Sequence, residues 1–124
     1  MILARAVAVG ACLVLMTLSW AGAHHRVLFG KARYYSNELS GEGMACGGKY
    51  RPWKMVAAHR NLPCGKEIRV KNRRNGRVVT VMVQDRGPYG DKDFIVDVSR
   101  RAARQLGFIS AGIARVKVTV LHDD

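Results

Sequence analysis

The chain has 124 residues, a formal net charge of +12 and 48% hydrophobic residues. This length corresponds to one domain, because domains commonly contain about 100–200 residues. The hydrophobic fraction is too high for a disordered basic tail, and 3 prolines with 13 glycines exclude a collagen-like chain. We therefore expect a single globular domain and exclude a multidomain machine, a polytopic membrane protein and a coiled coil.

The start of the chain is typical of an export signal. Arg5 supplies a positive charge, Ala6–Trp20 is almost unbroken apolar sequence, and small residues follow at the positions that a signal peptidase reads. The apolar run is shorter than the roughly 20 residues that span a bilayer, which favours cleavage over a retained anchor. Cys12 has too little apolar sequence before it for a lipoprotein signal. We predict a signal peptide at 1–23, a folded domain at 24–124, a periplasmic or secreted location and no stable membrane anchor.

Two cysteines, Cys46 and Cys64, remain after removal of the signal. An even pair in a small exported domain favours a disulfide, and closing the loop between them would stabilise the fold by about 3 kcal/mol. The alternative, two free buried thiols, is commoner in cytosolic proteins. The two cysteines have neither CxxC spacing nor nearby histidines, so no metal site is predicted, and nothing in the sequence calls for a cofactor.

The first half of the mature chain predicts strands separated by turns. The loose alternation over Phe29–Tyr35 favours a first strand, and the Gly, Ser, Asn and Glu content of Ser36–Gly48 predicts a long loop. Ile68–Lys71 alternates like a half-exposed strand. The Asn75-Gly76 pair predicts a tight type I′ hairpin turn, because both residues tolerate positive φ. The β-branched run Val78–Val83 follows as a central strand.

The second half adds two strands and a helix. Asp85–Pro88 interrupts the β pattern, because proline cannot donate to a strand ladder. The pattern resumes over Phe94–Val98, and Ser99 is a candidate N-cap for a helix over Arg100–Leu106 that a glycine ends. Alternating valines at Val116–Val120 predict the last strand. Many short strands with one small helix indicate an all-β barrel or sandwich.

Several short motifs occur in unbroken order from about Gly30 to Leu121. They are Gly30–Tyr35, Val56–His59, Leu62–Gly65, Val70–Asn72, Asn75–Arg77, Asp85–Pro88, Ile95–Ser99 and Ala102–Gly107. With these motifs the sequence resembles the rare lipoprotein A (RlpA-like) family of secreted bacterial double-psi β-barrels. The resemblance implies a six-stranded double-psi β-barrel with one short helix and a polysaccharide groove. It also implies the activity of characterised members, which are lytic transglycosylases acting on peptidoglycan glycan strands. These enzymes cleave the β-1,4 bond between N-acetylmuramic acid and N-acetylglucosamine and leave a 1,6-anhydro end.

The resemblance implies that Asp85 is the catalytic carboxyl. In a lytic transglycosylase the C6 hydroxyl of the sugar attacks its own anomeric carbon, so one carboxyl that protonates the leaving oxygen could suffice. The alternative is a turn-capping carboxylate paired with Arg86. His59 matches the family histidine and is a second catalytic candidate, orienting Asp85 or stabilising charge on the sugar ring. A histidine at the end of an apolar stretch is more often a structural residue.

Other positions have predicted roles in substrate binding or in the structure. Tyr35, Arg86 and Tyr89 are candidate substrate-binding residues, and Asp97 is expected to be a buried structural carboxylate bonded to loop backbone. The chain also departs from the family pattern. Gly48 stands where many members carry a glutamate, so a second acid would have to come from elsewhere, with Glu38 and Glu42 of the same loop as substitutes.

Basic residues gather in two places. They are Arg69, Lys71, Arg73, Arg74 and Arg77 around the predicted hairpin, and Arg100, Arg101 and Arg104 on the predicted helix. Such a surface either keeps the protein soluble or attracts an anionic polymer, which in a periplasm is the cell wall. Three functions follow: a lytic transglycosylase, a non-catalytic expansin-like wall-binding module, and a nucleic-acid binder. The export signal opposes the third, so we expect a monomer that binds glycan strands and no nucleic acid.

Overall fold

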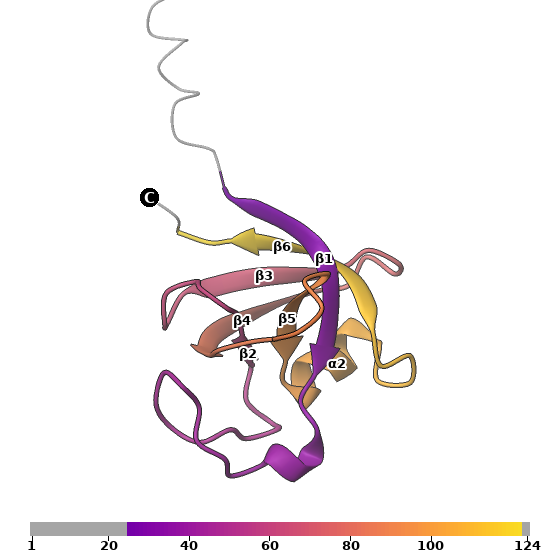
Figure 1. The fold of residues 1–124 in the computed structure, drawn as a ribbon. Helices are drawn as coiled ribbons and strands as arrows, with labels where there is room; N and C mark the ends of the chain where they lie inside the picture. Colours follow the sequence, from indigo (N-terminus) through magenta and orange to yellow (C-terminus); the bar gives the residue numbers. More distant parts are fainter. Residues whose placement is uncertain (1–24, 123–124) are drawn as a thin grey trace, which may run out of the picture.

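The computed structural model describes residues 25–122, so the predicted signal peptide and Cys12 lie outside the described residues (Figure 1). The elements in chain order are β1 (Val27–Tyr34), the 3-10 helix η1 (Asn37–Leu39), β2 (Val56–Ala58), β3 (Glu67–Asn72), β4 (Val78–Asp85), β5 (Phe94–Val98), α2 (Arg100–Leu106) and β6 (Ala114–Val120). Among these described elements no helix has the length and apolar character needed to cross a membrane.

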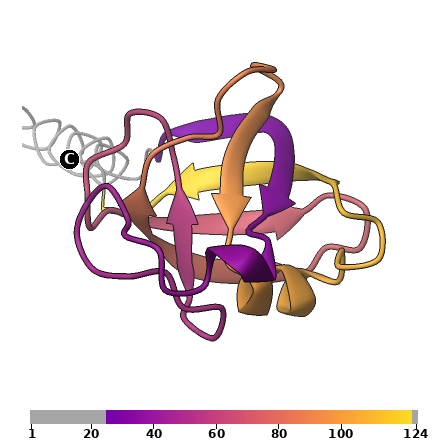
Figure 2. The same cartoon turned by 60° about the horizontal axis from the view of Figure 1, so that its bottom comes forward.

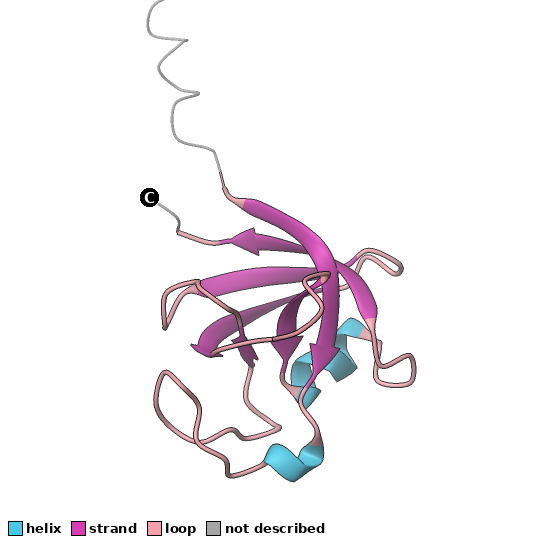
Figure 3. Cartoon of the chain, in the orientation of Figure 1, coloured by secondary structure: helices cyan, strands magenta, loops and turns pink. Residues whose placement is uncertain are grey.

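The six strands close into one barrel in the order β1-β5-β2-β4-β3-β6. Strand β1 pairs in parallel with β5 and antiparallel with β6, whereas β2 pairs in parallel with β4 and antiparallel with β5. Figures 2 and 3 show the strands wrapping around the core, with α2 beside one end of the barrel. The predicted all-β class, a six-stranded barrel with one short helix, is confirmed.

Side-chain alternation along the strands builds the core. In β3, Ile68 and Val70 are fully buried while Arg69 between them faces solvent, and β4 continues the pattern through Val81 and Val83. Because successive strand residues point to opposite faces, one face of each strand fills the barrel. The β-branched side chains that dominate this face also favour the extended backbone.

Helix α2 packs an apolar face of Ala102, Ala103 and Leu106 against the core. The hydroxyl of Ser99 accepts a hydrogen bond from the Ala102 N–H, and Gly107 ends the helix with φ +79°, a left-handed conformation that suits glycine. Both caps and both ends of this helix match the prediction from the sequence.

The turn between β3 and β4 differs from the prediction. A hairpin is present, but it spans residues 73–77, and only Gly76 of the Asn75-Gly76 pair has positive φ, so the type I′ turn is wrong. The Asn75 amide donates to the Leu106 carbonyl at 2.9 Å, and its side-chain oxygen accepts from the Arg77 N–H at 2.9 Å. The bond to the end of α2 and the bond within the turn stabilise a wider turn than the local sequence alone favours.

The predicted disulfide between Cys46 and Cys64 is present. It joins the long loop after β1 to the segment between β2 and β3, two parts of the chain that the barrel brings together. The same loop is held to strand β4, because the Cys46 N–H donates to the Gln84 carbonyl at 3.1 Å. The loop is therefore fixed beside the C-terminal end of β4.

Candidate active site

A depression of about 340 Å³ opens beside the ends of β1, β4 and β5. Its lining residues are Arg33, Tyr34, Tyr35, Ser36, Leu39, Asp85, Arg86 and Asp97. Strand register explains why two carboxylates meet there. Ala58 on β2 pairs with Asp97 of β5 on one side and with Asp85 of β4 on the other. The two aspartates thus come from strands separated by a single strand, with about 10 Å between their backbones.

Three donors fix the carboxylate of Asp85. The Tyr35 hydroxyl donates to Oδ2 at 2.5 Å, and Oδ1 accepts from the Ala45 N–H at 2.7 Å and from the Arg86 N–H at 2.9 Å. The donors come from the residue after β1, from the disulfide-linked loop and from the residue after β4. Asp85 is only half-buried, so its carboxylate is held in one orientation while it still lines the depression.

The guanidinium of Arg86 binds the backbone of a neighbouring loop. Its Nη1 donates to the carbonyl oxygens of His59 and Leu62 at 3.1 and 2.7 Å, and Nη2 lies 3.4 Å from the Cys64 sulfur. The alternative interpretation of Asp85 is therefore wrong in its ion pair with this guanidinium, but the carboxylate does cap the turn, because Oδ1 accepts from the Arg86 N–H. Arg86 nevertheless lines the depression, as expected of a substrate-binding residue.

Asp97 differs from the expectation of a carboxylate bonded to loop backbone. Val96 and Val98 point into the core, so the alternation places Asp97 on the opposite face, where it lines the depression. Its partner is a side chain: Arg33, its register partner on β1, lies with Nε 3.4 Å from Oδ1. Burial raises the pKa of Asp97, Arg33 and then Arg60 oppose that rise, and the nearby Asp85 adds a smaller contribution to it.

His59 is 7% exposed, and its ring binds the loop that follows it. The Nδ1 atom accepts hydrogen bonds from the N–H groups of Asn61 and Leu62 at 3.2 and 3.1 Å. Burial lowers the pKa of His59 from its usual 6.5 to about 4, and the positive charges of Arg60, Arg26 and Arg86 act in the same direction. The His59 backbone reaches the site, because its N–H donates to the Asp85 carbonyl at 3.1 Å. The hydrogen bonds to the Asp85 carboxylate come from other residues.

The two candidate tyrosines occupy different surroundings. Tyr35 is half-buried, and its ring stacks on Tyr50 with 4.4 Å between centroids. Burial raises the pKa of Tyr35, and the hydrogen bond to Asp85 raises it further, so the hydroxyl stays protonated and remains a donor. Tyr89 is 70% exposed and lies outside the lining of the depression.

The loop glutamates suggested as a second acid do not reach the depression. Glu38 and Glu42 are both exposed, and neither lines the depression. The second carboxyl in the lining is Asp97, and its partner Arg33 is a lining residue that was not among the predicted site residues. The signals for Arg33 are its place in the predicted first strand and in the Gly30–Tyr35 motif, but neither points to Asp97, because the two residues are 64 positions apart and the pairing of β1 with β5 must be known.

The closed six-stranded barrel, with its mixture of parallel and antiparallel strand pairs, is a double-psi β-barrel domain. A family model described as "Lytic transglycolase" matches residues 28–118, and the chain belongs to this family. The RlpA-like resemblance inferred from the motifs is thereby confirmed.

Relatives and solved structures agree with this assignment. The chain is 40% identical over 93 residues to the endolytic peptidoglycan transglycosylase RlpA of Haemophilus influenzae, and 42% identical over 91 residues to that of Pseudomonas aeruginosa. These alignments cover 75% and 73% of this chain but only 32% and 26% of the relatives, so the chain spans about a third or less of their length.

Two solved structures share the fold. A Streptomyces papain inhibitor matches with a TM-score of 0.63 and 23% identity, covering 78% of this chain and 96% of its own. The apo expansin of Clavibacter michiganensis matches with a TM-score of 0.62 and 25% identity, covering 80% of this chain and 52% of its own. A protease inhibitor and an expansin on one barrel illustrate that the fold alone does not determine the activity.

Proposed function

We propose that this protein is an exported peptidoglycan lytic transglycosylase that cleaves glycan strands in the periplasm or outside the cell. Family membership and the names of the relatives support this activity. The observation that carries the proposal is the pair of aspartates, Asp85 and Asp97, that line one depression in unlike surroundings. Where neighbouring carboxyls differ in this way, one is suited to carry a proton and the other to remain charged.

Asp97 is suited to carry the proton, because burial raises its pKa and its one described hydrogen bond is long. In the reaction, the protonated carboxyl donates to the oxygen that leaves with N-acetylglucosamine as the anomeric C–O bond breaks. The C6 hydroxyl of the same N-acetylmuramic acid attacks the anomeric carbon, forms the 1,6-anhydro bond, and returns its proton to Asp97. The group thus acts first as general acid and then as general base.

Asp85 is the other catalytic carboxyl in this proposal. Three donors orient it, and its negative charge can stabilise the positive charge that develops on the sugar ring as the bond breaks. Tyr35 and Arg86 line the same depression and are the proposed substrate contacts. His59 is a positioning residue, because its ring fixes the loop whose carbonyls bind Arg86.

Purified sacculi test the proposal. Release of anhydro-muropeptides, measured by mass spectrometry, should fall about 10²–10⁴-fold in Asp97→Asn and in Asp85→Asn. The matched control is Glu67→Gln, which removes the same charge from an exposed position on β3 and should keep full activity. Each variant needs an unfolding curve, so that loss of activity is not confused with loss of fold.

The leaving group separates the two roles. An aryl glycoside of N-acetylmuramic acid needs little protonation of its leaving oxygen, so it should recover most of the rate lost in Asp97→Asn. It should not recover the rate lost in Asp85→Asn. Equal recovery in both variants would show that the roles are assigned wrongly.

The second candidate is a non-catalytic wall-binding module. It is favoured by the likeness to an expansin and by Gly48, which has no carboxyl at the position where many family members have one. Binding to sacculi without anhydro products, unchanged in both aspartate variants, would replace the enzymatic proposal with this one.

A further inference from the structure

The long loop between β1 and β2 contains a small hairpin over residues 42–50. Gly43 and Lys49 pair as an antiparallel bridge, and the base of the hairpin is anchored by Tyr50, which is 1% exposed. The tip of the hairpin, residues 44–48, is largely exposed. The core therefore holds the base, whereas the tip depends on separate attachments.

Hydrogen bonds and one disulfide attach the tip to the barrel. The Ala45 N–H donates to Asp85 Oδ1 at 2.7 Å, and the Cys46 N–H donates to the Gln84 carbonyl at 3.1 Å. The Gln84 amide donates to the Gly47 carbonyl at 3.2 Å. These groups lie at exposed or half-buried positions, where water competes for the same hydrogen bonds. The disulfide is the attachment that water cannot replace.

The disulfide acts on the site through Ala45. Because Ala45 directly precedes Cys46, the bond that fixes Cys46 also places the Ala45 N–H against the Asp85 carboxylate. The other two donors to that carboxylate, the Tyr35 hydroxyl and the Arg86 N–H, lie outside the tip. Opening the disulfide should therefore remove one of the three donors, so that Asp85 is held less firmly.

Cys64 provides the access that thiol–disulfide exchange needs. Cys64 is exposed and Cys46 is half-buried, and Nη2 of Arg86 lies 3.4 Å from the Cys64 sulfur. A nearby guanidinium stabilises a thiolate, which is the form that attacks a disulfide. Cys64 is thus suited to react first with another disulfide.

We propose that the Cys46–Cys64 disulfide is an oxidative switch that completes the active site. The inference rests on the proposed function, because the group that it controls is the Asp85 carboxylate. In the dithiol form the tip is released and cleavage is slow, and in the disulfide form the Ala45 N–H binds Asp85 and cleavage is fast. Thiols stay reduced in the cytosol, whereas disulfides persist in the periplasm and outside the cell, so the switch ties cleavage to export.

The oxidant is another disulfide, and the exchange takes two steps. The Cys64 thiolate attacks one sulfur of the oxidant, which forms a mixed disulfide and releases the other sulfur as a thiolate. The Cys46 thiolate then attacks the Cys64 sulfur, which forms the protein disulfide and releases the second sulfur of the oxidant. Two electrons pass from the cysteines to the oxidant, and the released thiolates take up the two protons. A dithiol reverses both steps.

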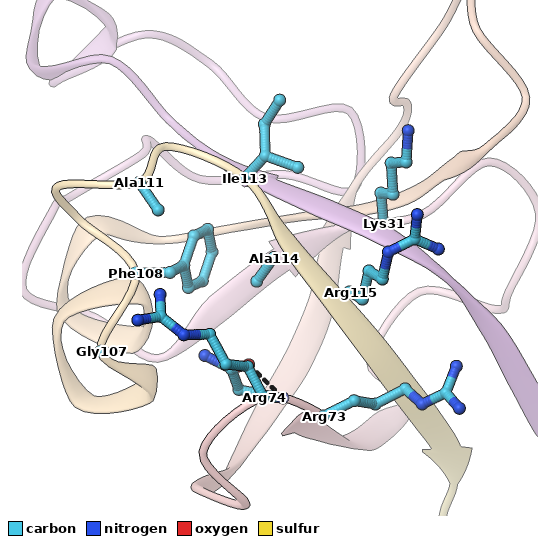
Figure 4. A pocket seen from close by; sticks show the side chains of 10 residues that line it. Lys31, Arg73, Arg74, Gly107, Phe108, Ala111, Ile113, Ala114 and Arg115 are labelled. Atoms are coloured by element: carbon cyan, nitrogen blue, oxygen red, sulfur yellow. Dashed lines mark hydrogen bonds between the residues drawn. The ribbon is translucent and has the colours of Figure 1, made fainter.

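A separate hollow provides the reference for the fold. It has a volume of about 620 Å³ and lies between the β3–β4 turn and the segment that joins α2 to β6 (Figure 4). None of its lining residues belongs to the tip or lines the depression. Hydrogen exchange, measured by mass spectrometry, should therefore become faster at residues 44–48 on reduction and stay unchanged at residues 107–115.

Activity is measured on sacculi as the release of anhydro-muropeptides. Oxidised wild type is compared with protein reduced by dithiothreitol, and thiol labelling gives the fraction of disulfide. We expect a rate about tenfold lower in the reduced protein, a rate that follows the disulfide fraction across the titration, and recovery on reoxidation. Cys46→Ser/Cys64→Ser should have the low rate with and without dithiothreitol, which controls for effects of the reductant on the assay.

Ala45→Pro separates the donor from the disulfide. Ala45 is the second residue of a turn closed by the Gly47 N–H and the Met44 carbonyl at 2.9 Å, and its φ is negative, so proline fits there. The variant should be about tenfold slower when oxidised and should lose little more on reduction, because both changes remove the same hydrogen bond. Ala45→Gly retains the N–H and should retain the tenfold response to reduction.

Three results would overturn the proposal. Full activity of the reduced wild type would show that the site does not need the disulfide. A second tenfold loss in reduced Ala45→Pro would show that the disulfide acts by another route than the Ala45 N–H. Faster exchange at residues 107–115 together with 44–48 would show that the disulfide only stabilises the whole fold.

Failure of the proposed function gives a different result. If oxidised wild type releases no anhydro-muropeptides, the assignment as a lytic transglycosylase fails. Hydrogen exchange needs no substrate and still decides whether the disulfide holds the tip against Asp85, because unchanged exchange at residues 44–48 on reduction would overturn the inference.

Discussion

Acid should weaken this fold through His59, because the native structure binds the ring in its neutral form. Nδ1 accepts two backbone N–H groups, and a proton on that atom would remove both hydrogen bonds. The folded pKa of about 4 lies below the usual 6.5, so the unfolded chain binds more protons between these values. The free energy of unfolding should therefore fall as the pH drops from about 6.5 to 4. At 1.36 kcal/mol for each pH unit, the loss from this group is about 3 kcal/mol.

His59→Asn is the informative variant. Its Oδ1 can accept from the Asn61 and Leu62 N–H groups as Nδ1 does, but it does not titrate in this range. Urea unfolding at a series of pH values measures the difference between wild type and variant, in which the contributions of other titrating groups cancel. The variant should lose about 3 kcal/mol less than wild type between pH 6.5 and 4.

Two results would refute this reasoning. Parallel stability curves for wild type and His59→Asn would show that the ring does not resist protonation in the fold. Full stability at pH 7 with cleavage abolished would show that the ring acts in the chemistry itself. His59→Leu is the control for the hydrogen bonds, because it leaves the Asn61 and Leu62 N–H groups without their acceptor and should cost about 1–3 kcal/mol at pH 7. This cost should shrink toward pH 4, because acid removes the same hydrogen bonds from wild type.

Three further perturbations follow from single contacts. Cys64→Ser should lower the free energy of unfolding by about 3 kcal/mol in urea, since it opens the loop to Cys46, and an unchanged midpoint would contradict this. Tyr35→Phe should lower turnover on sacculi about tenfold with little loss of stability, because it removes one of the three donors to the Asp85 carboxylate. Full turnover would show that the Tyr35 hydroxyl is dispensable. Gly30→Ala should destabilise the fold by about 1–3 kcal/mol, because its Cβ would lie 2.8 Å from the Asp93 carbonyl oxygen. An unchanged melting temperature would show that the backbone shifts to accommodate the methyl group.

The sequence predicts best where structure is encoded locally. Helix α2 has its N-cap, apolar face and terminal glycine within a few residues of one another, and its predicted bounds are those observed. Strand β5 alternates cleanly over Phe94–Val98 and is also found at its predicted bounds. Strand β2, by contrast, has three buried residues and no alternation to detect. It exists because β4 and β5 supply partners on both sides.

The candidate site also combines features that are encoded locally with features that depend on long-range pairing. Asp85 can be placed at the end of a strand from its motif alone, but its donors Tyr35 and Ala45 are 50 and 40 positions away. The alternation with Val96 and Val98 predicts on which face of the strand Asp97 lies. Its contact with Arg33, by contrast, can be predicted only when the parallel register of β1 with β5 is known. Long-range pairing therefore determines what surrounds each carboxyl, and those surroundings decide the chemistry that each can do.

Gly48 illustrates why the second carboxyl of the proposed mechanism comes from the barrel. The turn that contains it uses left-handed backbone at both Gly47 and Gly48, with φ of +106° and +77°, which disfavours a residue with a side chain. A Cβ built at Gly48 meets nothing within 4 Å, and Gly48 is not among the residues that line the depression. Asp97 instead projects from a strand whose neighbours are buried core residues, and Arg33 holds it beside Asp85. A carboxyl anchored in this way keeps its position without the loop, which supports assigning the proton transfer to Asp97 in this chain.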